Sequence, residues 1–345
     1  MDTTDTTDAT GILDEALERL HHAGPERLGR LSNHAPMAVE ALAAHGQAPA
    51  VHRWLDRYAR KLEDFPSRVE PVTAANWRAA LGDPGRAADW IDHFGRELAE
   101  HPWREVLAQW WPRLLPGLYG GSTHPVIRVG HAVRTLLAGA PGAATGPRLA
   151  ELAHGLGYWA ARHRPVTVPV LRPTAVGAAA ALDAVPPIAE RDGGFPARLD
   201  RVTALPVWAA GVAEPGEARD RLAELVRAAT HRYATHGHGE ETMLVHAATA
   251  PNAVLRALPA LPPALWPASL RAAWTASAAV TAMYAPAAPV PYVPPGAVTA
   301  EEVFERALSH GDEHVIKLAD TALNVGDERA LAAALRAVEL TEPLG

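Results

Sequence analysis

The sequence contains no cysteine, and this absence removes several kinds of chemistry at once. Disulfides, thiolate nucleophiles, iron–sulfur clusters and zinc sites built from cysteine are all excluded. Histidine, by contrast, occurs 17 times in the 345 residues. We therefore expect any metal or acid–base chemistry of this protein to use histidine.

Positive charge is also scarce, since 32 lysine and arginine residues face 39 aspartate and glutamate residues, for a net charge of −7. Proteins that bind nucleic acid or anionic membranes through electrostatics carry clustered positive charge. We therefore expect neither a nucleic-acid nor a membrane partner.

Motifs for nucleotide binding are missing as well. The sequence has no G-x-G-x-x-G after a predicted strand and no G-x-x-x-x-G-K-[ST], the two patterns that bring backbone close to phosphate. It also lacks G-x-S-x-G and H-E-x-x-H. No motif therefore supports a flavin or a bound nicotinamide cofactor.

The longest uncharged run, from Ala272 to Ala300, contains five prolines, which disrupt helices, so we do not expect it to span a membrane. The first residues are acidic and lack the basic-then-apolar order of a signal peptide, so we expect a cytoplasmic protein. We predict that residues 1–10 are disordered.

Apolar residues recur three and four positions apart, as on one face of a helix, at Ile12, Ala16, Leu17 and Leu20 and again at Leu149, Leu152, Leu156 and Trp159. Alternating strand patterns are nearly absent. The best of them, 166–170, is interrupted by Pro169 and is typical of an extended connector. The predicted fold is mostly α.

Helix ends can be placed from capping residues. Thr299 and Glu302 form a capping-box pattern, Gly311 followed by Asp312 ends one helix and begins the next, and Gly326-Asp327 repeats this before a helix to about Val338. Proline-rich connectors are expected near 163–173, 185–196, 258–267 and 285–296. We predict a single large multi-helical domain over 11–345 with long proline-rich loops.

His34 lies between Asn33 and Pro36, just before a helix expected from about Met37 to Ala44. This position, where the backbone turns, can aim a side chain inward. The alternative is a histidine that only caps or packs.

The stretch 120–134 combines glycines with His124 and His131, which lie seven residues apart. A helix from about Pro125 would place both on a similar face. Arg128, between them, can bind an anionic oxygen at two points, or it can form an ordinary ion pair.

His246 lies in apolar sequence, where an imidazole should be neutral and have a partner; a core histidine is the alternative. His314 and Lys317, three apart, share one helical face with apolar cover. A lysine buried there would have a lowered pKa and could react with carbon dioxide to form an anionic carbamate, whereas a surface lysine would do neither.

Five segments together resemble the questin oxidase-like family of mostly helical proteins associated with aromatic polyketide pathways. In order along the chain they are the His34 segment with Asn33, Pro36 and Met37, the Gly121-x-x-His124-Pro-x-Ile127 stretch, Gly157-Tyr158-Trp159-Ala160, His246 to Asn252, and His314-Val-Ile-Lys-Leu318.

The resemblance implies oxidation or oxidative ring cleavage of anthraquinone-like compounds by dioxygen. It implies a non-haem Fe(II) held by His34, His124, His246 and His314 and by Lys317 carboxylated by carbon dioxide. It also favours Tyr158 and Trp159 as substrate-binding residues, and the chemistry of its guanidinium makes Arg128 a third candidate. In the fungal pattern a second histidine often stands at the position of Arg128, so the second ligand is either His124 or His131, and we expect His124.

Two alternatives are kept. One is a metal-free, NADPH-assisted Baeyer–Villiger-type monooxygenase in which the histidines act as acids and bases. The other is a non-catalytic helical protein that binds a hydrophobic metabolite. The aromatic residues do not decide between them, because large aromatics at helical spacing, such as Trp54, Tyr58, Trp110 and Trp111, are more often core.

Overall fold

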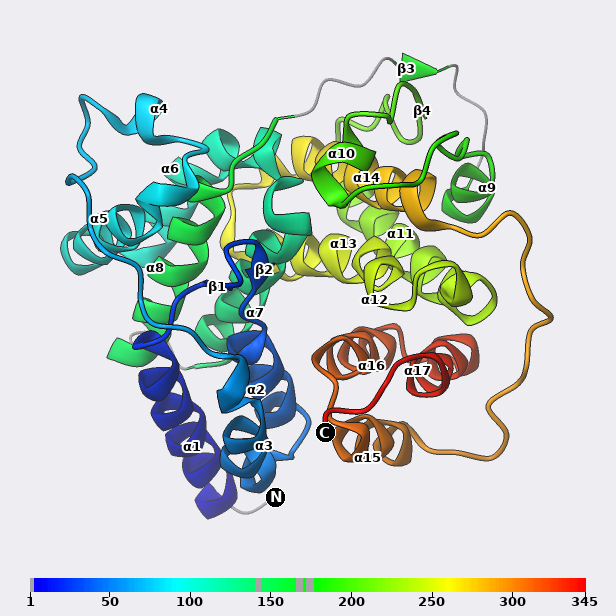
Figure 1. The fold of residues 1–345 in the computed structure, drawn as a ribbon, viewed down its shortest axis with the longest axis horizontal. Coiled ribbons are helices and arrows are strands. Elements are labelled where there is room, and N and C mark those ends of the chain that lie inside the picture. The colour runs from blue at the N-terminus through cyan, green and yellow to red at the C-terminus, as the bar shows by residue number, and fades with distance from the viewer. Residues whose placement is uncertain (1–2, 140–143, 166–169, 172–176) are drawn as a thin grey trace. The chain divides into compact units, whose positions relative to one another are not determined.

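The computed structural model describes residues 3–139, 144–165, 170–171 and 177–345 (Figure 1). The described residues are mostly helical, which confirms the predicted fold class, and their strands are only two residues long. The connector predicted at 166–170 lies outside the described residues except for Val170. Within the described residues, none of the helices combines the length and the apolar character needed to cross a membrane.

The chain falls into two compact units. The first comprises Met1–Pro165 with Pro259–Pro262 and Gly345, and the second comprises Val166–Leu258 and Pro263–Leu344. The chain passes between them at 165–166 and again around 258–263, which are two of the proline-rich connectors expected from the sequence. A single domain over 11–345 stays a prediction.

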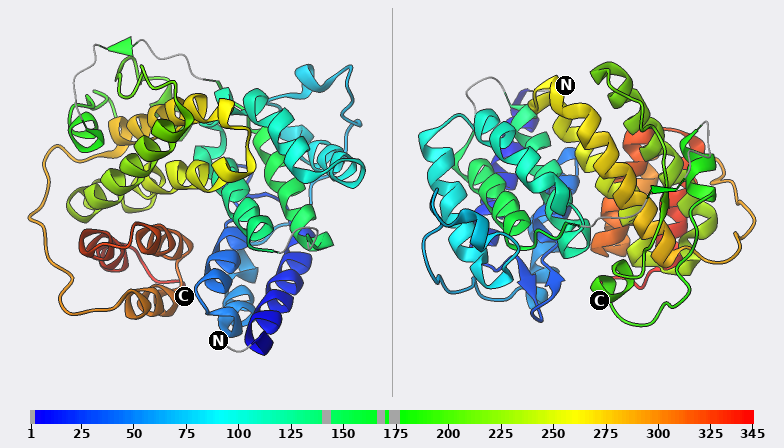
Figure 2. Two further views of the ribbon diagram at one scale, coloured as in Figure 1. Left: turned by 180° about the vertical axis from the view of Figure 1, so that it is seen from behind. Right: turned by 90° about the horizontal axis from the view of Figure 1, so that it is seen from above.

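The helices of the first unit enclose an apolar core, and several of them are visible in both views of Figure 2. They are α1 (Thr3–His21), α2 (Ala35–Ala44), α3 (Val51–Tyr58), α4 (Trp77–Ala80), α5 (Ala87–Glu100), α6 (Trp103–Leu114), α7 (His124–Ala138) and α8 (Gly146–Ala161), with a small antiparallel pair of strands, β1 (Glu26–Arg27) and β2 (Leu31–Ser32).

Helix α8 is central to the first unit, because α1, α5 and α7 all pack against it. Gly157 makes the crossing with α5 possible, since a Cβ there would lie 2.6 Å from the Ile91 side chain. Six of the eight residues on the two predicted apolar faces are buried, Leu17 and Leu156 among them, whereas Ile12 and Leu149 are half-buried. Burying such faces is the main source of helix stability in a folded chain.

We predict that residues 1–10 are disordered, but in the structure helix α1 already begins at Thr3. Extending an existing helix by one residue is much easier than starting a new one, so the amphipathic part that begins near Ile12 can propagate backward.

The second unit contains the remaining helices: α9 (Ala178–Asp183), α10 (Phe195–Leu199), α11 (Pro215–His236), α12 (Glu241–Leu244), α13 (His246–Ala257), α14 (Trp266–Tyr284), α15 (Ala300–His310), α16 (Glu313–Val325) and α17 (Glu328–Leu340). Its strands β3 (Val170–Leu171) and β4 (Leu205–Pro206) form a short parallel pair. Helix α11 packs against α13, α14, α16 and α17.

The predicted helix ends in the second unit are confirmed. Thr299 and Glu302 form a complete capping box at the start of α15. The carboxylate of Asp312 accepts hydrogen bonds from the backbone N–H groups of His314 and Val315, and Asp327 caps α17 in a similar way. The Asp312 cap determines where α16 begins, and therefore where His314 and Lys317 lie along it.

Candidate functional site

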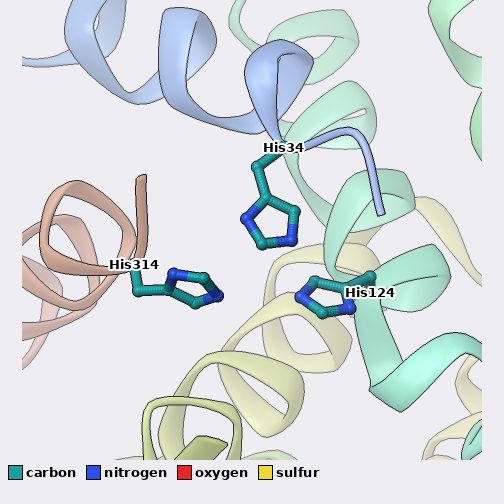
Figure 3. Close-up of side chains that lie close together, drawn as sticks. All are labelled: His34, His124 and His314. Atoms are coloured by element: carbon teal, nitrogen blue, oxygen red, sulfur yellow. The ribbon is translucent and has the colours of Figure 1, made fainter. Parts of the chain in front are cut away.

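Two of the predicted ligands meet in the first unit. The imidazole rings of His34 and His124 stack with centroids 4.3 Å apart and planes 28° apart. Both are buried, with exposed fractions of 5% and 7%. Figure 3 shows His34 at the start of α2 and His124 at the start of α7, with their rings directed toward each other.

His34 is held by a hydrogen-bonded turn between β2 and α2. The side chain of Asn33 accepts a hydrogen bond from the backbone N–H of Ala35 (3.1 Å) and donates one to the carbonyl of Gly24 (3.0 Å). The backbone N–H of His34 donates to the hydroxyl of Tyr58 (3.0 Å). These bonds hold the backbone of His34, which is the N-cap residue of α2.

The turn before α7 orients His124. The Nδ1 atom of His124 lies 2.8 Å from the carbonyl oxygen of Gly121. A carbonyl can only accept, so Nδ1 carries the proton and Nε2 carries the lone pair. This is the arrangement in which protein imidazoles bind metal ions, with the other ring nitrogen donating to a fixed acceptor.

His131, the other candidate for the second ligand, has different surroundings. Its Nδ1 lies 2.6 Å from a carboxylate oxygen of Glu40, and Arg134 binds the same carboxylate. Burial raises the pKa of Glu40, but the charges and hydrogen bonds of Arg134 and His131 outweigh this and lower it to about 2. His131 thus takes part in a buried ion-pair network, whereas His124 lies against His34.

The second unit contributes another pair of histidines. His246 and His314 meet edge to face, with ring centroids 5.8 Å apart and planes 83° apart. The Nδ1 atom of His246 lies 3.1 Å from the carbonyl oxygen of Met243, so this ring also has its lone pair on Nε2. The Nδ1 of His314 lies 3.5 Å from a carboxylate oxygen of Asp312.

Lys317 lies one turn after His314 on α16, and its exposed fraction is 0%. Among the described residues its Nζ has no hydrogen-bond partner. Burial lowers the pKa of this amine to about 8, although the carboxylates of Glu313 and Asp312 oppose the shift. The amine is therefore far easier to deprotonate than an exposed lysine.

All four candidate histidines lie at helix starts. His34 is the N-cap of α2, His124 and His246 are the first residues of α7 and α13, and His314 is the second residue of α16. An imidazole binds a metal ion in its neutral form, through the lone pair of one ring nitrogen.

The three residues predicted to bind substrate have protein partners. The Arg128 guanidinium donates two hydrogen bonds to Glu151, at 2.6 and 2.7 Å. The hydroxyl of Tyr158 lies 2.7 Å from that of Ser32, and Trp159 is fully buried against Trp111. Their substrate-binding role stays a prediction.

Sequence reasoning identified Asp312 only as a helix cap and missed its contact with the His314 ring. The scarcity of lysine in the sequence is a further indication that Lys317 has a special role. The chain has only two lysines, Lys61 and Lys317, among its 32 basic residues. A protein that uses arginine almost everywhere else keeps a lysine where the side chain is buried and its pKa is lowered, which are properties that arginine cannot provide.

Imidazoles that helices hold in buried or half-buried positions could bind a metal ion in this mostly helical chain. Residues 31–139 match the family model described as Questin oxidase-like, which confirms the predicted resemblance over that stretch. The match includes His34 and His124 and ends before the residues of the second unit. Comparison with curated proteins finds no match to this chain.

Proposed function

We propose that this protein is a questin oxidase-like oxygenase that oxidises or cleaves a polycyclic aromatic substrate with a non-haem iron. The proposed ligands are His34, His124, His246, His314 and carboxylated Lys317. The family match over 31–139 and the two histidine pairs, three of whose four rings are buried, support the proposal.

The observation that carries the proposal is the state of Lys317. A structural lysine is exposed at its tip or paired with a carboxylate, because an unpaired buried ammonium is costly. Lys317 is fully buried, and among the described residues its amine has no hydrogen-bond partner. Once the ammonium has lost a proton, the neutral amine can attack carbon dioxide and release a second proton, which leaves an anionic carbamate oxygen in place of the cation. A metal cation bound to this oxygen would compensate the buried negative charge.

The donor set fits ferrous iron, which binds imidazole nitrogen together with anionic oxygen. When bound, the iron would supply redox chemistry with dioxygen and a template for the substrate. The protein's own contribution is to fix the tautomers of His124 and His246 through the carbonyls of Gly121 and Met243, and to keep water from the buried rings.

The first test is elemental analysis of protein purified without added metal. We expect iron in the wild type and its loss in Lys317→Ala, because removal of a ligand typically weakens metal binding strongly. Lys61→Ala is the matched control: its amine lies over the ring of Tyr58 at 5.2 Å, and it should retain iron. Iron-free wild type that gains no activity on anaerobic iron loading would refute the proposal.

The second test separates the metal-dependent reaction from an NADPH-assisted one. Oxygen uptake is measured with a hydroxylated anthraquinone as substrate, with and without NADPH. The proposal predicts uptake without NADPH, since the electron-rich ring supplies the electrons. Uptake that strictly requires NADPH and is unaffected by chelation would favour the metal-free alternative.

A further inference from the structure

The turn that precedes His124 is built from three successive residues with left-handed backbone. Gly121, Ser122 and Thr123 have φ angles of 56°, 56° and 67°. Glycine adopts this conformation readily, but for a β-branched residue such as Thr123 it is a rare, strained state. Strain of this kind persists only where the surroundings enforce it, and it is concentrated at functional sites.

The surroundings of this turn do enforce it. A Cβ on Gly120 would lie 1.5 Å from the carbonyl oxygen of Arg162, so the backbone there is in direct contact with the end of α8. A Cβ on Gly121 would lie 3.1 Å from both the Tyr158 hydroxyl and the Pro125 ring. The chain therefore has little room to relax into an ordinary helix start.

Thr123 is also unusual in its side chain. Its exposed fraction is 0%, and among the described residues its hydroxyl has no hydrogen-bond partner, although it occupies the N-cap position of α7, where threonine normally caps. Thr135, on the same helix, behaves normally and donates to the carbonyl of His131 at 3.1 Å. A buried hydroxyl without a partner is unfavourable unless a bound molecule supplies one.

We propose that the Thr123 hydroxyl donates a hydrogen bond to an oxygen atom of the substrate, a phenol or quinone oxygen, bound beside His124. This inference rests on the proposed function and adds a substrate-contacting residue to it. Thr123 directly precedes His124, whose ring faces His34 (Figure 3). The strained turn would then serve to hold, one residue before a candidate metal ligand, a hydroxyl for which the described residues supply no acceptor.

The test compares Thr123→Val with Thr135→Val. Each substitution removes one buried hydroxyl, the first from the N-cap of α7 and the second from within that helix. The probe is 1,8-dihydroxyanthraquinone, titrated without oxygen and followed by its visible absorbance. We expect Thr123→Val to raise the Kd of the probe about three- to tenfold, the equivalent of one neutral hydrogen bond, and Thr123→Ser to restore it. Thr135→Val should leave this Kd unchanged.

In thermal unfolding without the probe we expect the larger effect from Thr135→Val, whereas in probe binding we expect it from Thr123→Val. Thr123→Val should unfold at the wild-type Tm or above, because the hydroxyl that it removes has no partner in the free protein. Thr135→Val should lower the Tm by about 2–4 °C.

Three results would overturn the inference: wild type that does not bind the probe, equal probe affinity in wild type and Thr123→Val, or a drop in Tm for Thr123→Val as large as for Thr135→Val. If the affinities are equal but the wild type retains iron, only the role of Thr123 fails. If iron is absent and loading has no effect, the proposed function fails first.

Discussion

Buried carboxylates in the first unit have arginine partners, and Glu151 is the clearest case. Its side chain is 5% exposed and that of Arg128 is 3% exposed, and the pair is bidentate. Burial raises the pKa of Glu151, but the charge and hydrogen bonds of Arg128, with a smaller contribution from His21, lower it from 4.5 to about 2. The folded protein therefore stabilises the ionised carboxylate.

This shift predicts how stability depends on pH. The pKa of Glu151 is lower in the folded state, so its contribution is complete above about pH 5 and is lost as the pH falls toward 2. The contribution is about 3 kcal/mol, since one pKa unit corresponds to about 1.4 kcal/mol. Urea unfolding at a series of pH values should show this loss in the wild type and a smaller one in Glu151→Gln. An equal pH dependence in both proteins would contradict the assignment.

Lys317 gives a second prediction at this scale. Protein equilibrated with ¹³C-labelled bicarbonate should show a carbamate carbon signal by NMR, because the lowered pKa of Lys317 supplies the neutral amine that reacts with carbon dioxide. Lys317→Arg should abolish the signal and Lys61→Arg should not. A signal that follows Lys61 would assign the carbamate to the wrong lysine for the proposed site.

Single residues also show what the sequence could not reveal. Arg128 forms the ion pair that the sequence left as the alternative to a contact with substrate, and its partner Glu151 lies 23 residues away on α8. Only the packing of α7 against α8 brings the two together. Likewise, His124 and His131 are equivalent by spacing, and the difference between them arises from Glu40 on α2.

Between helices, a ladder of buried polar pairs joins α13 to α16. At one end of the ladder the rings of His246 and His314 are in contact. Further along, the side-chain amide of Asn252 donates a hydrogen bond to Thr321 at 3.1 Å. At the other end Arg256 and Asp320 form an ion pair of 2.8 Å. Polar pairs in an apolar interface match only in one register. We infer that this ladder fixes the register in which the two candidate ligands face each other.

The ion pair at the end of the ladder, Arg256 with Asp320, allows a quantitative prediction. Asp320→Leu alone should lower the free energy of unfolding by about 3–5 kcal/mol, because it leaves a buried guanidinium without its carboxylate. The double variant Arg256→Met with Asp320→Leu should recover most of this loss, since buried ion pairs are often replaceable by apolar residues. Additive effects in chemical denaturation would show that the two side chains are not coupled.

A helix start could be predicted from the sequence when residues close to it in the chain determine where it lies. The starts of α15, α16 and α17 follow from capping side chains within three residues, so the sequence was sufficient. The turn at 120–123 was not predictable, because contacts with Arg162 and Tyr158, far along the chain, force its left-handed backbone.

For the whole molecule, composition and periodicity were enough to predict a mostly helical chain. The division into two units was not predicted, although both crossing points fall in expected proline-rich connectors. Composition does not change at these connectors, so nothing in the sequence distinguishes them from loops inside a domain. The candidate ligands are spread over both units, His34 and His124 in the first and the other three in the second. That these five residues bind one metal ion is inferred from the family resemblance.

Metal removal tests the proposed ligand set through the stability of the folded protein. A ligand that binds only the folded state stabilises it by an amount that grows with its concentration, about 2.7 kcal/mol at one hundred times Kd. We expect chelation to lower the Tm of the wild type and anaerobic Fe(II) to restore it. Lys317→Ala should not respond to either treatment, whereas Lys61→Ala should respond like the wild type. A Tm that chelation leaves unchanged in iron-containing wild type would mean that the metal is not bound by the folded core, because its binding free energy would then be missing from the unfolding equilibrium.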